Sequence, residues 1–203
     1  PLHTALAVYG CVLGYDLIAD EMKDKELSEL VKRIGLVEGM PVVTNPGIID
    51  PEKFADEVIN VRIPNPFMPD TPQRIATDTS QKVGIRYGET IKSYVAKDGS
   101  ARALTAIPLA IAGWCRYLLG IDDNGEAFEL SPDPMADELK CQLDGIVWGE
   151  SSSYTGQLKN LLSNANIFGI NLYEAGIGDK IEEMFVEEIS GKGAIRETLK
   201  KYL

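Results

Sequence analysis

His3 is the single histidine of the chain and the first residue whose type could support chemistry. It lies in the opening stretch "PLHTALAVYG", where Pro1 suits the first position of a helix. His3 would then belong to the first helical turn, whose unpaired backbone N–H groups and positive dipole end favour an anion or a developing oxyanion. The other interpretation, an exposed side chain at a frayed chain end, stays open at this point.

The stretch "RIATDTSQK" contains a second group of candidate residues. Arg74, Asp78 and Lys82 follow one another at intervals of four, so a continuous helix would stack them along one side. One interpretation is an exposed ladder of ion pairs, each of which stabilises a helix by only a few tenths of a kcal/mol. The other is a binding surface, because the intervening threonines and serine are poor helix-interior residues and Pro72 and Gly84 flank the segment.

Other kinds of chemistry are disfavoured by the motifs that the chain lacks. The glycine-containing stretches "GIGDK" and "SGKGA" have neither a preceding strand nor the spacing of a nucleotide-binding loop, so we interpret them as turns or helix caps. One histidine without a nucleophile elbow supports no Ser/His/Asp triad. The three cysteines are far apart and form no Cys/His cluster, which predicts free, buried thiols and no metal site.

Composition narrows the possible partners and compartment. The 31 acidic residues outnumber the 20 basic ones and give a net charge of −11, a field that repels phosphate backbones and anionic lipid. We therefore expect no nucleic-acid and no membrane partner. There is no apolar run long enough to span a bilayer and no basic signal-peptide region, so a cytoplasmic protein is expected.

Most of the chain has helical periodicity, which predicts a single all-α domain of about eight or nine helices over residues 1–203. The predicted helices include residues 4–15, 73–80, 82–96, 134–148, 153–168 and 173–189. The most apolar stretch, "ARALTAIPLAIAGWCRYLLG", should form the central helix with Trp114 buried, and Pro108 would start, kink or divide it. "GIDDNGEAFEL" predicts a small β-hairpin.

Three stretches in order resemble the C-terminal domain of the mannitol dehydrogenase family: "PLHTALAVYGCVLGY", "NPFMPDTPQRIATDTSQK" and "LAIAGWCRYLLGIDDNGEAFELSPDP". This is a family of polyol-specific long-chain dehydrogenases that use NAD, and the resemblance covers essentially the whole chain. The opening stretch is most similar to bacterial members that interconvert D-mannonate and D-fructuronate, so the resemblance implies that activity. It also implies a mainly helical fold, which the periodicity predicts independently.

The resemblance assigns roles to three residues. The family signature is a lysine, four residues, an asparagine, two residues and a histidine, and His3 matches the histidine as a catalytic residue. The lysine, which is the general base of a metal-independent hydride transfer, and the asparagine would precede Pro1, as would the Rossmann domain that binds NAD. Arg74 and Lys82 match the spacing of the family's substrate-binding arginine and lysine, and would grip distant hydroxyls or a carboxylate.

Two alternatives remain open at this stage. Within the family, the substrate could be mannitol or another alditol, because members that act on neutral polyols resemble this chain at Arg74 and Lys82. Outside it, the chain could be a stand-alone helical binding or interaction domain without catalysis. In the preferred interpretation the partners are a sugar acid or polyol and the Rossmann domain, and the chain by itself does not catalyse hydride transfer.

Overall fold

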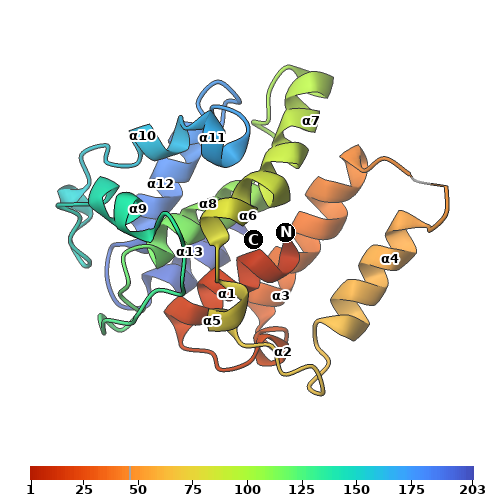
Figure 1. Cartoon of the computed structure of the whole chain (residues 1–203), viewed down its shortest axis with the longest axis horizontal. Coiled ribbons are helices and arrows are strands. Elements are labelled where there is room, and N and C mark those ends of the chain that lie inside the picture. The colour runs from red at the N-terminus through yellow and green to blue at the C-terminus, as the bar shows by residue number, and fades with distance from the viewer. Residues whose placement is uncertain (46) are drawn as a thin grey trace.

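The central element is α8 (Ala106–Tyr117), all of whose residues are buried. In the computed structural model, which describes residues 1–45 and 47–203, α1 (Leu2–Leu13) packs along one side of α8 and α12 (Gly178–Glu188) along another (Figure 1). Trp114 is fully buried, as predicted, and its indole Nε1–H donates to Thr79 Oγ1 at 3.0 Å. The predicted all-helical fold is therefore confirmed.

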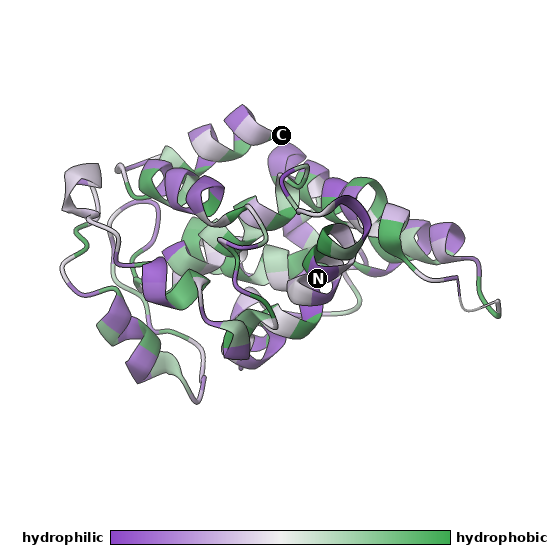
Figure 2. Ribbon diagram, turned by 90° about the horizontal axis from the view of Figure 1, so that it is seen from above, coloured by the Kyte–Doolittle hydropathy of each residue, from purple (hydrophilic) through white to green (hydrophobic). Residues whose placement is uncertain are grey.

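The remaining helices surround this core. They are α2 (Ile18–Glu21), α3 (Lys25–Lys32), α4 (Pro51–Glu57), α5 (Pro72–Ile75), α6 (Thr79–Val83), α7 (Glu89–Asp98), α9 (Ala136–Gln142), α10 (Lys159–Leu162), α11 (Ala165–Phe168) and α13 (Ala194–Tyr202). Three π-helical segments, η1 (Arg33–Gly39), η3 (Val58–Arg62) and η4 (Gly84–Gly88), and two 3-10 turns, η2 (Met40–Val42) and η5 (Ser151–Ser153), extend or connect them. Figure 2 shows hydrophobic residues concentrated in the interior and hydrophilic residues on the outer helix faces.

The N-terminus of α8 is capped by a residue from a distant part of the chain. The Glu38 carboxylate, which is buried, accepts hydrogen bonds from the backbone N–H groups of Thr105, Ala106 and Ile107 at 2.6–2.8 Å. Pro108 follows in the first turn and has no N–H to satisfy, so it starts the helix without kinking it. Every free donor at this helix end is thereby paired, and η1 is fixed against α8.

Several predicted helices prove shorter than expected. The continuous helix over residues 73–80 is wrong, because the chain ends α5 at Ile75 and turns at Asp78, which adopts a left-handed backbone conformation with φ of 55°. The helix expected over residues 134–148 is reduced to α9, and the one expected over residues 173–189 is reduced to α12. The helix expected over residues 153–168 is divided into the short helices α10 and α11. Glycines with positive φ lie between or beside these pieces and interrupt them.

Two smaller expectations also change. The β-hairpin is reduced to one antiparallel bridge between Ile121 and Ala127, and no longer strand occurs among the residues that the structure describes. Cys11 and Cys115 are buried free thiols as expected, whereas Cys141 is exposed.

Two of the buried carboxyl groups, those of Glu21 and Glu188, have raised pKa values and form no ion pair among the described residues. The Tyr9 hydroxyl lies 2.8 Å from the Leu109 carbonyl oxygen and 2.6 Å from Glu188 Oε1. Because its single proton cannot serve both acceptors, a protonated Glu188 completes the arrangement. Burial raises the pKa of Glu188 to about 8 and that of Glu21, whose carboxyl oxygens contact no hydrogen-bonding group among the described residues, to about 9.

Replacing the cap of α8 should destabilise the domain. We expect Glu38→Ala to lower the free energy of unfolding by about 2–4 kcal/mol, more than an ordinary N-cap loss of ~1 kcal/mol, since three buried N–H groups lose their acceptor. Urea denaturation monitored by circular dichroism measures this. The control is Glu29→Ala, which removes an exposed partner of Arg33 and should cost under ~1 kcal/mol. Equal losses in the two variants would contradict the capping role.

Stability should fall as pH rises from about 5 to about 9. Over this range the folded state retains protons on Glu21 and Glu188 that the unfolded chain, with a glutamate pKa near 4.5, has already released. Each group contributes a slope of at most ~1.4 kcal/mol per pH unit. Glu188→Gln should flatten the profile and stabilise the domain at pH 9, whereas the exposed Glu183→Gln should leave it unchanged. Thermal unfolding across pH measures both.

Candidate functional site

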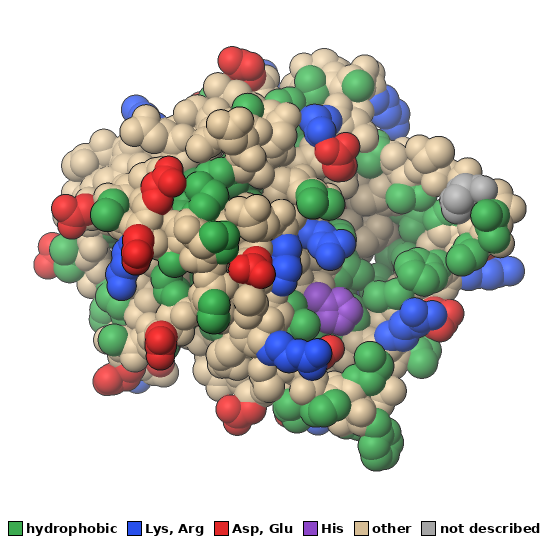
Figure 3. Space-filling view, viewed as in Figure 1, with side chains coloured by type: hydrophobic (Ala, Val, Ile, Leu, Met, Phe, Trp, Pro, Cys, Tyr) green, Lys and Arg blue, Asp and Glu red, His purple; other side chains and the backbone are tan. Residues whose placement is uncertain are grey.

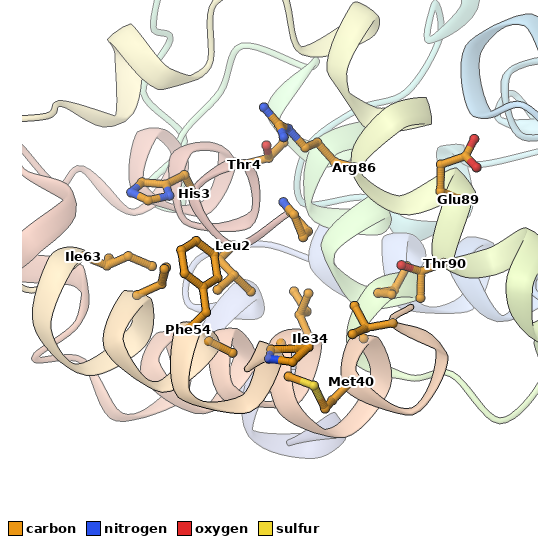
Figure 4. A pocket seen from close by; sticks show the side chains of 18 of the residues that line it. Leu2, His3, Thr4, Ile34, Met40, Phe54, Ile63, Arg86, Glu89 and Thr90 are labelled. Atoms are coloured by element: carbon orange, nitrogen blue, oxygen red, sulfur yellow. The ribbon is translucent and has the colours of Figure 1, made fainter. Parts of the chain in front are cut away.

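A cavity of about 930 Å³ opens at the N-terminus of α1. Its walls are the first turn of α1, the segment from η1 to η3, and the face of α6, η4 and α7. Figure 3 shows this hollow with the purple histidine side chain at its edge and several Lys and Arg side chains around it. The cavity thus combines a positively charged rim with an apolar wall, which in Figure 4 includes Leu2, Ile34 and Phe54.

His3 lines this cavity from the first turn of α1. The helix begins at Leu2, with Pro1 in the N-cap position, and the Tyr87 hydroxyl donates to the Pro1 carbonyl oxygen at 3.2 Å. Burial lowers the pKa of His3; the positive charge of Arg86 acts in the same direction, and the negative charge of Asp70 opposes it. The imidazole is therefore neutral at pH 7 and carries one N–H for donation to a ligand oxygen.

Lys82 also lines the cavity, and its position depends on the turn between α5 and α6. Its ammonium donates to the carbonyl oxygens of Ile75 at 3.1 Å and Thr77 at 2.5 Å, so it closes the C-terminal end of α5. Asp133, from a distant loop, accepts from the backbone N–H and the hydroxyl of Ser80 and holds the start of α6. The sequence pattern alone did not reveal this structural role of Lys82.

Arg74 lies at the rim of the cavity and not in its lining. Its side chain is 74% exposed and its Nη1 donates to Asp70 Oδ1 at 2.9 Å, and Asp70 does line the cavity. Gly10 of α1 makes this placement possible, since a Cβ there would lie 2.7 Å from Pro72 at the start of α5. The structure thus brings His3 and Lys82 to one cavity and places Arg74 at its edge.

Arg86 is a cavity residue that sequence reasoning missed. It lies in η4 and extends toward the side of the cavity where Thr4 and His3 lie (Figure 4). The sequence gives only a weak signal for it, an arginine between two glycines in "GIRYG". Both glycines lie against backbone atoms of α11.

Other kinds of site find little support in the part of the chain that the structure describes. Its His, Cys, Asp and Glu side chains do not gather in groups of three or more that could hold a metal ion. No helix there is long and apolar enough to cross a membrane. The glycines of "GIGDK" and "SGKGA" lie at the starts of α12 and α13, as expected of turns and caps.

The all-helical fold of this chain is found in a known family of domains. Residues 2–189 match the mannitol dehydrogenase C-terminal domain, and the chain belongs to that family. It is 56% identical to D-mannonate oxidoreductase of Thermotoga maritima over 202 residues, which cover 99% of this chain and 37% of the relative.

More distant relatives extend the comparison. D-mannonate oxidoreductase of Escherichia coli is 31% identical over 138 residues, which cover 68% of this chain and 27% of the relative. The fold resembles a ternary complex of Pseudomonas fluorescens mannitol 2-dehydrogenase with NAD and D-mannitol, with a TM-score of 0.79, 22% identity, and coverage of 98% of this chain and 38% of that one. The matched part of the chain therefore spans between 27% and 38% of the length of these relatives.

As the chain's single histidine, His3 gives one resolved imidazole signal, so its electrostatic environment is directly measurable. We expect its pKa, from an NMR titration of the imidazole carbon-bound protons, to lie below the usual 6.5. Asp70→Asn should lower it further because the negative charge that favours the imidazolium is lost. Arg86→Gln should raise it. A shift in the opposite direction in either variant would contradict the arrangement described here.

Proposed function

We propose that this chain is the substrate-binding domain of an NAD-dependent oxidoreductase that interconverts D-mannonate and D-fructuronate. The observation that carries the proposal is the neutral His3 in the first turn of α1, facing the same cavity as Lys82 and Arg86. The similarity to the Thermotoga maritima D-mannonate oxidoreductase supports this choice of substrate.

In this proposal His3 binds the oxygen at the reacting carbon. The neutral imidazole donates one hydrogen bond to that oxygen in both the alcohol and the carbonyl form, and the positive end of α1 favours any charge that develops on it. Because α1 is buried immediately beyond its first turn, from Thr4 to Val12, the imidazole is held on a rigid support. Lys82 and Arg74 contribute positive charge toward the more distant oxygen atoms of the substrate.

NAD, when bound, supplies the acceptor for the hydride that leaves the alcohol carbon. This chain fits such a cofactor only in part: Leu2, Ile34 and Phe54 provide an apolar wall suited to a nicotinamide ring, but the described residues form no strand, and hence no βαβ unit for the dinucleotide. The proposal therefore includes a Rossmann domain that precedes this chain in the complete enzyme.

Exposed apolar side chains occur along the chain segment that forms one wall of the cavity, where that domain would dock. Between residues 43 and 68 the exposed large hydrophobic side chains are Val43, Ile48, Ile49, Phe54, Val61, Phe67 and Met68. Phe67 is 92% exposed and Ile48 is 89% exposed. Exposed apolar side chains in this number favour a protein partner, and the Rossmann domain is the one that the proposed reaction requires.

The two alternative functions differ in the observations that support them. Oxidation of mannitol with better kcat/KM than oxidation of D-mannonate would favour the alditol alternative, for which the D-mannitol complex of the structural relative is the supporting observation. The stand-alone binding domain has no observation in its favour beyond the fold.

The proposal predicts a sharp difference between this chain and the complete enzyme. Titration of NADH into the isolated chain should show no saturable binding at micromolar concentrations, and no turnover of D-fructuronate. The complete enzyme should reduce D-fructuronate, and His3→Gln should lower kcat by roughly 10²–10³-fold because a hydrogen bond to the reacting oxygen is lost. Loss of NADH absorbance measures turnover. Turnover by the isolated chain, or an unchanged kcat in the variant, would contradict the proposal.

A further inference from the structure

Arg86 differs from Arg62 and Lys82, which also line the cavity, because no side chain or carbonyl of the described residues engages its guanidinium. Arg62 pairs with Glu57 at 2.9 Å and lies over the Phe54 ring, and Lys82 donates to two backbone carbonyls. No Asp or Glu of the described residues lies within ion-pair distance of Arg86, although it is less than a turn from Glu89, which pairs with Lys92 instead. Its guanidinium is thus available to an anionic ligand.

The backbone of η4 fixes the direction in which Arg86 points. A Cβ at Gly84 would lie 2.2 Å from the Ile167 carbonyl oxygen, and a Cβ at Gly88 would lie 1.9 Å from that of Phe168. Both positions can therefore only be glycine, and together they press one face of η4 against α11. Arg86 is two residues from each, which places it on the opposite face of the helical turn, toward the cavity.

The side chains that line the cavity near Arg86 indicate which kind of anion its guanidinium would bind. Thr4 and His3 lie on the same side of the cavity as its guanidinium (Figure 4), while Phe54 and Ile63 form the apolar wall. A ligand whose reacting oxygen contacts His3 would extend along the cation-bearing side, where a planar carboxylate can accept two parallel hydrogen bonds from a guanidinium.

We propose that Arg86 binds the carboxylate of the sugar acid and so selects acidic substrates over neutral polyols. This inference rests on the proposed function, in which His3 contacts the reacting oxygen. Arg74 and Lys82 contribute less to this selection, because Asp70 partly neutralises the first and backbone carbonyls engage the second. Arg86 is accordingly a specificity-determining residue.

The test compares D-fructuronate with D-fructose, its neutral counterpart, in the complete enzyme. Arg86→Gln should lower kcat/KM for D-fructuronate by roughly 10- to 100-fold, the loss expected for hydrogen bonds to a charged group. It should lower kcat/KM for D-fructose far less and leave the KM for NADH unchanged. Arg86→Lys should restore part of the loss. Arg102→Gln is the matched control, since Arg102 is also exposed, forms no ion pair among the described residues and lies outside the cavity. This variant should leave kcat/KM for both sugars unchanged.

The possible failures are distinguishable. If the wild-type enzyme does not turn over D-fructuronate, the proposed function is wrong, and calorimetric binding of D-mannonate and D-mannitol to wild type and Arg86→Gln still decides whether Arg86 recognises the carboxylate. If the wild type is active and Arg86→Gln reduces turnover of both sugars equally, or raises only the KM for NADH, the inference is overturned. Circular dichroism and thermal unfolding of each variant identify any loss of folding.

Discussion

The structure depends most on the contact between the Glu38 carboxylate and the N-terminus of α8. This helix is the buried centre of the domain, and its first turn exposes backbone donors in a region where water cannot reach them. Glu38 pairs those donors and at the same time holds η1 and the following turn in place. Since η1 forms one wall of the cavity, the interaction that completes the core also shapes the site.

Helix α1 likewise belongs both to the core and to the site. Its middle is a core element, with the residues from Thr4 to Val12 buried against α8 and α5, while its first turn reaches the cavity with His3. The bond from the Tyr87 hydroxyl to the Pro1 carbonyl ties this turn to η4, which carries Arg86. The two helical segments that carry His3 and Arg86 are thus connected through one buried tyrosine.

The fold class, the buried Trp114 and the place of His3 in a first helical turn could be predicted from the sequence, because each follows from local periodicity or a local helix-start signal. The break at Asp78 could not, since it depends on Asp133, which is more than 50 residues away in the chain and holds the next helix. Arg86 was missed for a similar reason. Its significance comes from the backbone of α11 opposite its flanking glycines, and a single sequence does not show that contact.

The π-helical pitch of η4 has a consequence for how this part of the chain can vary over evolution. A π-helical segment contains one residue more per hydrogen-bonded turn than an α-helix, so a deletion within it would restore the α-helical pitch and rotate the following residues. Gly84 and Gly88 would still share a face, because positions three or four apart do so in a helix, but α7 beyond them would turn about its axis. The length of this segment and its two glycines are therefore constrained together, whereas the side chain at position 86 can be replaced without insertion or loss.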